Sequence, residues 1–593
     1  MGVAEGVFDD LGGKFEARLR DHRIVTRTTR MREGDLTIAN PIAVLEAKFD
    51  FNVLDRLHEP SFVGVERTTS QGSTYLIYEV VALRPTHFQM LGMDVAMPTV
   101  IRKEYLNVIE TSWGKSDETW IDVISIPTKY RMDLEGGELK FSKARLVPLI
   151  GSQVHLLSKE TVKGFLCVTG GATVGSLIGF DMPLTVNIDS VVKYHAGIFG
   201  FTGSGKSNLT SYLIREAIDG IPDLKVIIFD VAGEYSIHLL DRLESNGMIF
   251  STESFEGSVE DFLNSQAIPE TLQEKVKEDV LQGKVKALFD KGIIQRISLG
   301  LPAEATNITL GYILSILQKV SDDKGSGAIQ ASIALNKIVK ELQTKKGCDA
   351  KADVMTFKEE DKESLKEILG ELSGSVHGMS SLKLDITALI EQIDSGVGEI
   401  KENEAKSAFM NPEALSSFIL SEESPQINIV YIPEPDELRQ AASRFITRLL
   451  FLKKRKGARK KVLVILDEAQ EFIPSDPRPT KDNFTEQSNR AVEALLRQGR
   501  KYRAHCWLGT QRVAHLNVNA LQQLHSYFVS TLPRFYDRMV IADAFGSSYD
   551  AIEKTTELET GQWLFVSYKA TRQKNVPAFI QAPDNEEILL KYL

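Results

Sequence analysis

A glycine-rich octapeptide at residues 200–207 constrains the fold of this chain more than any other feature. Its sequence, GFTGSGKS, matches the pattern G-x-x-x-x-G-K-[ST] and stands between an apolar run at residues 195–199 and a helical pattern at residues 208–217. A strand, a tight loop and a helix in this order bring backbone N–H groups and a helix N-terminus to one point, which favours phosphate binding. Glycines are required because the chain must curl around an anion with no Cβ in the way. The flanking strand and helix disfavour the alternative, a glycine-rich turn that binds nothing.

The octapeptide also supplies side chains for a complex of nucleotide and metal. Lys206 is predicted to reach the β- and γ-phosphates of ATP, and the Ser207 hydroxyl is predicted to bind Mg²⁺. The residues expected to hold the nucleotide are Gly200, Thr202, Gly203, Ser204, Gly205, Lys206, Ser207 and Asn208. ATP and Mg²⁺ are therefore the expected cofactors.

Length and composition limit the class of protein. The chain has 593 residues, too many for one core, and roughly two to four domains are expected. No apolar run approaches the ~20 residues that span a bilayer, and the N-terminus lacks the apolar region of a signal peptide. The spacing of Cys167, Cys348 and Cys506 suggests neither disulfides nor a zinc site, so a cytoplasmic protein is predicted. The net charge of −11 argues against an overall basic surface, although a local basic lining would still bind nucleic acid.

The first 165 residues are predicted to be mostly β. Segments rich in Val, Ile, Tyr and Trp are separated by Gly, Pro and Ser turns, which is typical of the short strands of a small barrel or sandwich. The expected strands are residues 43–51, 74–83, 120–126 and 153–157. A glycine-dense segment at residues 170–179 is expected to connect this region to the next domain.

From about residue 185 strands alternate with helices, which indicates an α/β core. Continuous apolar runs suit strands buried on both faces of a parallel sheet. Such runs lie at residues 225–230, 427–432, 461–466, 506–509 and 527–530, and a helix is expected from Pro435. Charged segments with helical spacing at residues 272–289, 308–320 and 365–372 predict a large helical insertion. The expected domains are a β region at 1–165, a core at 166–250 and 426–570, an insertion at 251–425 and a tail at 571–593.

A second catalytic element follows the apolar run Val462–Leu466. Two acids at the end of such a strand form the Walker B arrangement that accompanies a phosphate loop. Asp467 is predicted to bind the Mg²⁺ shell, and Glu468 is predicted to polarise the attacking water as general base. The alternative, a buried strand ending in a solvated acidic turn, is disfavoured by the phosphate loop in the same chain.

Three further motifs complete the candidate catalytic set. Gln511 follows the strand at residues 506–509, where an amide can sense the γ-phosphate or align water; the alternative is a solvated loop amide. Arg500 lies in a basic cluster, and in a ring such an Arg can stabilise charge on a neighbour's γ-phosphate, the alternative being a solvated helix face. Asp230 and Glu234 close the strand after the phosphate-loop helix, where parallel strands border a ligand crevice. The alternative there is an ordinary strand-end turn.

Together these motifs resemble those of the HerA branch of the HerA/FtsK motor ATPases. The matching segments are HAGIFGFTGSGKS at 195–207, DVAGEY at 230–235, LDEAQ at 466–470, and GRK at 499–501 leading to Thr510 and Gln511. Their order and approximate spacing agree across residues 120–580. The resemblance implies an α/β fold with a RecA-like P-loop ATPase core, preceded by a small N-terminal β-barrel of the HAS type. It also implies a hexameric ring that translocates double-stranded DNA with ATP.

The resemblance assigns roles to individual residues. It implies nucleotide and metal binding by Lys206 and Ser207, Mg²⁺ binding by Asp467, general base catalysis by Glu468, sensing by Gln511, a finger in trans at Arg500 and a further family position at Glu234. Three positions depart from the family pattern: Gln470 and Ala232 stand where many relatives have His, and Gln498 replaces a frequent acid. These departures remove no group that the chemistry needs.

The partners are less directly encoded in the sequence. The densest basic run, residues 453–456 with 459–461, is either a solvated face or a DNA contact. HerA relatives act with NurA-type nucleases, or with sirtuin-like or nuclease effectors in antiphage defence, so an effector protein is an expected partner beside DNA. Two alternatives stay open: an ATP-controlled hexameric scaffold that activates an effector without processive translocation, and a conjugation or partitioning pump. The pump is disfavoured because such proteins usually carry a membrane segment.

Overall fold

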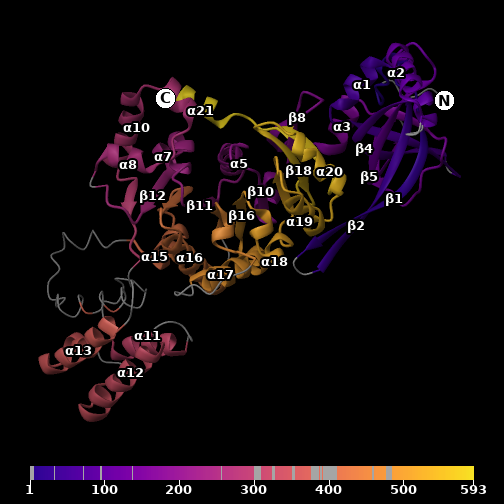
Figure 1. Cartoon of the computed structure of the whole chain (residues 1–593). Helices are drawn as coiled ribbons and strands as arrows, with labels where there is room; N and C mark the ends of the chain where they lie inside the picture. The colour runs from indigo at the N-terminus through magenta and orange to yellow at the C-terminus, as the bar shows by residue number, and fades with distance from the viewer. Residues whose placement is uncertain are drawn as a thin grey trace. The chain divides into compact units, whose positions relative to one another are not determined.

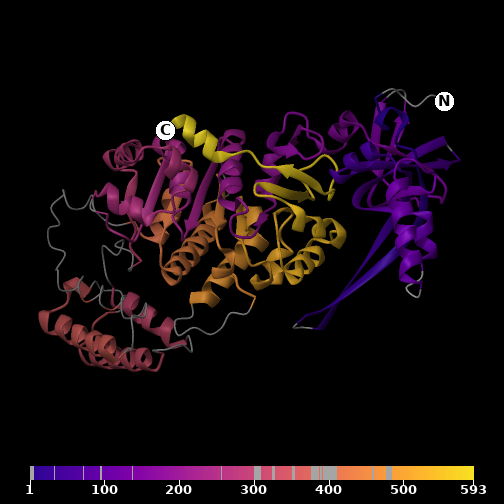
Figure 2. The same cartoon turned by 45° about the horizontal axis from the view of Figure 1, so that its top comes forward.

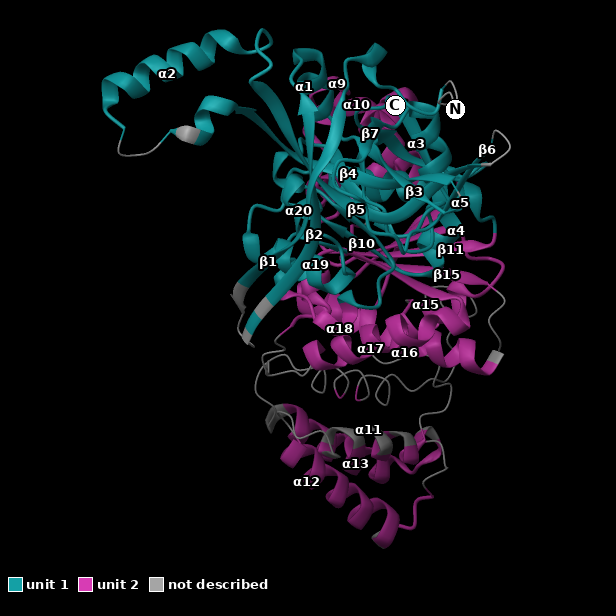
Figure 3. Ribbon diagram, turned by 90° about the vertical axis from the view of Figure 1, so that its right-hand side faces the viewer, with its two compact units in different colours: residues 1–222, 509–514, 521–585 teal, residues 223–508, 515–520, 586–593 magenta. Residues whose placement is uncertain are grey.

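The computed structural model divides the chain into two compact units (Figure 3). Unit 1 contains residues 1–222, 509–514 and 521–585, and unit 2 contains residues 223–508, 515–520 and 586–593. The structure describes residues 6–593 except for 32–33, 71, 94–96, 136–137, 256, 300–308, 323–327, 350–353, 376–385, 387–389, 391–409, 457–459 and 476–483. Each unit contains its own set of strands.

The N-terminal part of unit 1 is an antiparallel sheet (Figure 1). Its strands are β1 (Ala17–Met31), β2 (Gly34–Lys48), β3 (Phe62–Thr69), β4 (Gly72–His87), β5 (Thr119–Glu135), β6 (Glu138–Lys143) and β7 (Gln153–Leu156). They follow the order β2-β1-β7-β3-β4-β5-β6, and β5 also pairs with β2. Leu45, Val63 and Val123 are fully buried, as expected for strands with one face in a core. The predicted β character is confirmed, whereas the small barrel stays a prediction.

Local sequence signals explain where the predicted strands begin and end. Two of them lie inside β4 and β5, but the strand predicted at residues 43–51 ends with β2. It ends there because Asp50 Oδ1 accepts hydrogen bonds from the N–H groups of Asn52 (2.8 Å) and Val53 (3.4 Å) and so caps α1 (Phe51–His58). Figure 2 shows β1 and β2 continuing together as a long two-stranded ribbon.

Helix α2 (Thr99–Ser112) connects β4 to β5 and was not predicted. Figure 3 shows it standing away from the strands of unit 1. Val100, Ile101, Leu106 and Val108 are exposed, and Ile109 is its buried residue. The apolar residues of this helix gave no strong signal in the sequence, because charged residues interrupt them.

The second part of unit 1 contains the strand before the phosphate loop. Its strands are β8 (Ala172–Leu177), β9 (Met182–Val186), β10 (Ala196–Phe199), β17 (Ser526–Val529), β18 (Gln562–Ser567) and β19 (Ala578–Gln581). They follow the order β10-β17-β18-β19-β8-β9, in which only β10 and β17 are parallel. The glycine-dense segment at residues 170–179 is therefore not simply a linker, because most of it forms β8. Gly171 is required there, since a Cβ would lie 2.5 Å from the carbonyl oxygen of Val186.

Unit 2 contains a parallel sheet of buried strands. These are β11 (Leu224–Asp230), β12 (Gly247–Ser251), β13 (Ile294–Arg296), β14 (Ile427–Tyr431), β15 (Lys461–Leu466) and β16 (Ala504–Thr510), in the order β13-β12-β14-β11-β15-β16. All adjacent pairs in this order are parallel. Every residue of β14 is buried, which explains why the apolar runs in the sequence are continuous rather than alternating. The last two residues of β16 belong to unit 1.

The predicted helical insertion at 251–425 requires correction at its start. Residues 259–290 form α8 (Val259–Ser265), α9 (Glu270–Lys275) and α10 (Glu278–Asp290), and β13 then joins the sheet beside β12. The single helix predicted at 272–289 is broken because Val276 has an extended backbone, with φ −108° and ψ 131°.

The later part of the insertion is a helical cluster (Figures 1 and 2). Helices α11 (Leu310–Asp322), α12 (Ala328–Ile338) and α13 (Glu359–Ser375) share a core that includes Leu317, Ala331 and Leu369. Most of residues 376–409 lie outside the described residues. No helix in the described part of the chain is long and apolar enough to cross a bilayer.

Candidate nucleotide site

The phosphate loop joins β10 to α5 (Lys206–Gly220), the place that the sequence predicts. Gly203 and Gly205 have φ values of +80° and +89°, a left-handed backbone that favours glycine. A Cβ on Gly200 would lie 2.4 Å from Ser204 Oγ, so this glycine allows the loop to close on itself. The octapeptide therefore has the tight, Cβ-free curvature of an anion cradle.

The atoms inside the loop fit a bound phosphate. The Oγ of Ser204 is buried and has no hydrogen-bond partner among the described residues. A buried hydroxyl without a partner is uncommon and indicates an absent ligand or water. Lys206, the first residue of α5, is 8% exposed, which is rare for a lysine and suits one that faces an anion. ATP with Mg²⁺ matches this set, in which the loop backbone, Lys206 and Ser207 would hold the phosphates and the metal.

Gln511 lies at the phosphate loop, as its predicted role requires. The Oγ1 of Thr202 donates a hydrogen bond to Gln511 Oε1 at 2.5 Å. The N–H of Gly200 donates to the carbonyl oxygen of Thr510 at 3.3 Å, which fixes the end of β16 beside the loop. Two predicted residues far apart in sequence are thus brought together within unit 1.

The side chain of Asn208 makes hydrogen bonds within unit 1. Its Nδ2 donates to the carbonyl oxygen of Pro583 (2.9 Å), and its Oδ1 accepts from the N–H of Asn585 (2.7 Å). Arg215, two turns further along α5, donates from Nε to Asn585 Oδ1 at 2.7 Å. The Asn208 side chain therefore holds the segment at residues 583–585 against α5, a contact that no pattern in the sequence indicated, and its role toward a nucleotide stays a prediction.

In unit 2 the predicted acids gather where β11 and β15 end. The parallel register pairs Phe229 with Leu466, so Asp230 and Asp467 follow at equivalent positions. Both side chains are buried. Burial and the negative charge of Asp467, with a smaller contribution from Glu234, raise the pKa of Asp230 to about 7.

Hydrogen bonds explain how Asp230 is accommodated. Its Oδ1 accepts from the N–H groups of Ala232 (3.0 Å) and Gly233 (2.9 Å), and its Oδ2 accepts from the N–H of Tyr235 (3.0 Å). These donors oppose the rise in pKa and hold the loop that carries Glu234. Asp230 thus organises this edge, whereas the resemblance had emphasised Glu234, which is half-buried.

Glu468 has a left-handed backbone, with φ 49° and ψ 53°, uncommon for a residue with a side chain. Such strain is typical of functional sites whose surroundings impose it. Gln470 donates from Nε2 to Glu468 Oε2 at 2.7 Å, so the residue that departs from the family pattern contacts the predicted base.

Arg500 lies on η7 (Gly499–Tyr502), directly after α17 (Phe484–Gln498), and is exposed. The exposed position suits a group that acts on another chain, as predicted for the finger.

The predicted basic run is largely engaged within unit 2. Lys453, near the end of α16 (Pro435–Lys456), is 1% exposed and donates to the carbonyl oxygens of Lys460 (2.5 Å) and Arg503 (3.3 Å). Burial lowers the pKa of Lys453 to about 8. Lys460 lies 3.0 Å from the carboxylate of Glu422. Lys453 is therefore neither a solvated cation nor a DNA contact, and Arg459 lies outside the described residues.

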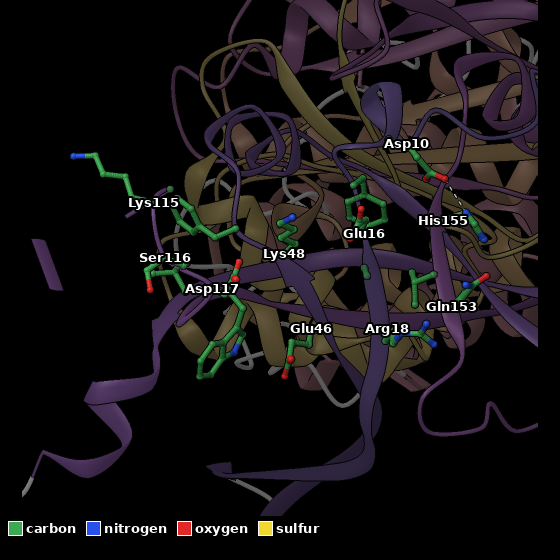
Figure 4. A pocket seen from close by; sticks show the side chains of 18 residues that line it. Asp10, Glu16, Arg18, Glu46, Lys48, Lys115, Ser116, Asp117, Gln153 and His155 are labelled. Carbon is green, nitrogen blue, oxygen red and sulfur yellow. Dashed lines mark hydrogen bonds and ion pairs between the residues drawn. The ribbon is translucent and has the colours of Figure 1, made fainter. Parts of the chain in front are cut away.

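A broad cavity of about 980 Å³ lies among β1, β2, β5 and β7 (Figure 4). Acids and cations are mixed along its lining, which includes Asp10, Glu16, Glu46, Asp117, Arg18, Lys48 and Lys115. His155 Nδ1 lies 2.7 Å from Asp10 Oδ2. The predicted site residues do not line it, and its mixed charges give no field that would favour an anion such as ATP.

Comparisons with known proteins identify the family. A family model described as "Helicase HerA, central domain" matches residues 172–450. The DNA double-strand break repair helicase HerA of Saccharolobus solfataricus is 21% identical over 435 residues, which are 71% of this chain and 70% of that protein. The central part of the chain, residues 172–450, belongs to the HerA family. The resemblance seen in the motifs is thereby confirmed, and membership of this class of P-loop ATPases points to nucleotide binding and ATP hydrolysis.

Two solved structures also match much of this chain at low sequence identity. VirB4 of Thermoanaerobacter pseudethanolicus is 12% identical, with a TM-score of 0.39, and the match covers 70% of this chain and 97% of VirB4. The bacterial conjugative coupling protein TrwBdeltaN70 is 12% identical, with a TM-score of 0.37, and the match covers 72% of this chain and 92% of TrwB. The family assignment rests on the family model and the HerA relative.

Proposed function

We propose that this HerA-family chain is an ATP-driven translocase of double-stranded DNA that works as a hexameric ring. The observation that carries the proposal is the phosphate loop itself. It contains the buried Lys206, a Ser204 hydroxyl that has no hydrogen-bond partner in the part of the chain that the structure describes, and Thr202, which donates a hydrogen bond to Gln511. The anion-binding shape of the loop is the reason for proposing a nucleotide as the ligand. The match to the HerA family is the reason for proposing a DNA motor.

Each candidate residue has a proposed chemical role. Lys206 neutralises the β- and γ-phosphates, and Ser207 with Asp467 holds Mg²⁺. Glu468 accepts a proton from the attacking water, and Gln511 aligns that water or senses the γ-phosphate. Arg500 acts on a neighbouring chain, because transition-state charge on the γ-phosphate is stabilised by a cation supplied in trans. Glu234 adds an acid at the same edge as Asp230.

The partners belong to the same proposal. An effector protein, such as a NurA-type nuclease or a sirtuin-like or nuclease effector of antiphage defence, acts with the ring. The N-terminal sheet is proposed to be the small barrel of the family, and the cytoplasm is the proposed location. Among the cations of the basic run, Lys454 and Arg455 are exposed and remain candidates for DNA contact.

A second candidate function is an ATP-controlled scaffold that activates an effector without processive translocation. The hydrogen bond from Gln470 to Glu468 bears on it, because a bond that held the base back would suit hydrolysis used as a switch.

ATP hydrolysis by the full-length protein, with and without double-stranded DNA, distinguishes these functions. Stimulation by DNA that is lost in Glu468→Gln supports the translocase. Hydrolysis that is lost in Glu468→Gln but indifferent to DNA supports the scaffold. Hydrolysis that survives in Glu468→Gln contradicts the assigned base, and an absence of nucleotide binding contradicts both functions.

A further inference from the structure

One segment of unit 1 contacts both the phosphate loop and the N-terminal sheet. It consists of α20 (Tyr549–Glu553), η9 (Lys554–Glu557) and the turn that enters β18, and residues 549–561 are called the connecting segment below. We propose that the connecting segment positions the phosphate loop for nucleotide and links that position to the N-terminal sheet. The inference rests on the proposed function, because it concerns the same nucleotide site.

At its C-terminal end the connecting segment holds two carbonyl groups of the loop. The Oγ1 of Thr560 donates to the carbonyl oxygen of Gly203 (3.3 Å), and the N–H of Gly561 donates to the carbonyl oxygen of Ser204 (3.1 Å). The C=O of Ser204 and the N–H of Gly205 belong to one planar trans peptide and point in opposite directions. Fixing this carbonyl on the connecting segment therefore directs the N–H of Gly205 to the other side, where an anion cradle needs it.

The backbone of the turn at Gly561 favours glycine, because its φ of +81° is a left-handed conformation. A Cβ on Gly205 would lie 3.7 Å from Gly561, an ordinary van der Waals distance, so the loop and the turn lie side by side. The carbonyl oxygen of Gly561 in turn accepts from the N–H of Ala582 at 2.8 Å, which anchors the turn on the end of β19. The backbone of Gly561 thus makes one hydrogen bond to the end of β19 and another to the phosphate loop.

At its N-terminal end the connecting segment is bound to the N-terminal sheet. Asp550 Oδ1 accepts from Arg27 Nη2 at 2.5 Å, and the Arg27 guanidinium lies 4.9 Å from the ring centre of Tyr549. Lys554 donates from Nζ to the carbonyl oxygen of Val80 on β4 at 3.2 Å. Ala551 is fully buried in a cluster with residues of β2, β4 and β5. The connecting segment therefore makes both polar and apolar contacts with the N-terminal sheet.

The middle of the connecting segment is fixed as well. Thr555 is fully buried, and its Oγ1 donates to the carbonyl oxygen of Ile552 at 2.7 Å. The carbonyl oxygen of Leu558 accepts from Thr531 Oγ1 at 2.8 Å. Because Lys554 and Thr560 lie on one short stretch with its backbone held between them, a shift of β4 is carried to the phosphate loop.

The first test concerns the positioning role of Thr560 and uses the full-length protein. Binding of a fluorescent ATP analogue with Mg²⁺ is measured for Thr560→Val, which keeps the shape of the side chain but removes the donor. Loss of one hydrogen bond predicts affinity weaker by about 3- to 10-fold. The kcat at saturating ATP is expected to stay within about 2-fold, because the loop affects binding rather than the base.

Two variants control this experiment. Thr560→Ser restores the donor and is expected to restore affinity. Thr556→Val removes a hydroxyl of the same segment that donates to the carbonyl oxygen of Glu553 (2.9 Å), and it is expected to bind as the wild type does. An unchanged affinity in Thr560→Val, or an equal loss in Thr560→Ser, overturns the positioning role.

The second test concerns the link to the N-terminal sheet. Lys554→Met removes the donor to Val80 and is expected to weaken binding of the analogue by about 3-fold. Lys554→Arg keeps a cationic donor and is expected to bind normally. In the double variant Lys554→Met/Thr560→Val the loss is expected to be smaller than the product of the single losses, because both act through one segment. Losses that multiply, or an unaffected Lys554→Met, overturn the link.

Lys206→Ala separates failure of this inference from failure of the proposed function. If the wild type binds the analogue, Lys206→Ala does not, and Thr560→Val binds normally, then the nucleotide site stands and only the inference fails. If Lys206→Ala binds as tightly as the wild type, the nucleotide site itself has been misplaced and both fail.

Discussion

The phosphate loop of unit 1 and the acidic edge of unit 2, where Asp230, Asp467 and Glu468 lie, both carry groups suited to charged ligands. The two regions differ in the atoms that they offer. The loop offers backbone N–H groups, and its shape depends on Gly203, Gly205 and the donors on Thr560 and Gly561. The acidic edge offers carboxylates of Asp230, Asp467 and Glu468, and burial together with the charge of Asp467 raises the pKa of Asp230 to about 7. A backbone site is controlled by conformation, whereas a side-chain site is controlled by electrostatics. Variants of the first are expected to alter binding, and variants of the second are expected to alter turnover.

The strongest test of this contrast is Glu468→Gln. The amide keeps the size of the side chain but cannot accept the proton of water, so kcat is expected to fall by about 10²- to 10⁴-fold. The affinity for ATP is expected to change by less than about 3-fold, because the loop is untouched. Steady-state hydrolysis and nucleotide binding are measured in parallel, with Glu471→Gln as the neighbouring control. A large loss of affinity in Glu468→Gln would break the contrast.

The reverse pattern is expected for Lys206→Ala. Removing a buried cation that faces an anion predicts nucleotide affinity weaker by about 10²-fold or more. Lys193→Ala, which removes an exposed cation at the end of α4 (Ile188–Lys193), is the control and is expected to bind normally. Titration of a fluorescent ATP analogue measures both. If Lys206→Ala bound the analogue as tightly as the wild type does, the nucleotide site would not lie at this loop and the contrast would fail.

A buried carboxyl group that belongs to neither site, Glu79 on β4, tests how burial affects stability. Burial raises the pKa of Glu79 to about 8 in spite of nearby Lys554. Because the folded state binds this proton more tightly than the unfolded state does, the stabilising contribution is complete below the ordinary pKa of 4.5 and is lost as pH rises through about 8. The two pKa values set a range from about pH 5 to about pH 8. Over this range the free energy of unfolding is expected to fall less in Glu79→Gln than in the wild type. The difference is on the order of a few kcal/mol.

Denaturant unfolding of unit 1, followed at several pH values, measures this effect. Glu138→Gln, an exposed position on β6, is the matched control and is expected to leave the pH dependence unchanged. Identical pH profiles for Glu79→Gln and the wild type would show that the carboxyl group titrates normally in the folded chain.

Residues whose role is set by local chain chemistry were predictable from the sequence. The phosphate loop lies between β10 and α5 because its glycines, its Lys and its flanking apolar run all favour the same local structure. In unit 2, strands β11, β14, β15 and β16 were predictable because burial on both faces leaves a continuous apolar run, whereas β12 and β13 were not predicted. The placement of Gln511 beside the loop also agrees with its motif.

Residues whose role is set by distant partners were not predictable. In the sequence, Lys453 is part of a run of cations. In the structure, its buried amine donates hydrogen bonds to the carbonyl oxygens of Lys460 and Arg503. Asn208 follows the phosphate loop in sequence, yet its side chain binds Pro583 and Asn585. In both cases the deciding hydrogen bonds are made to backbone groups, which leave no mark on residue type. The break between α9 and α10 escaped prediction because the apolar spacing continues through it.

Gln470 gives the smallest expected effect and the finest test of the contrast. Its amide donates to Glu468 Oε2, which orients the carboxylate of a residue with a left-handed backbone. Gln470→Ala removes this donor, so kcat is expected to fall by about 3- to 10-fold while ATP affinity stays unchanged. Steady-state hydrolysis and nucleotide binding, with Gln498→Ala as the control, measure this effect. A rise in kcat would instead identify the hydrogen bond as a brake on Glu468 and favour the scaffold, in which hydrolysis is released only when a partner breaks that bond.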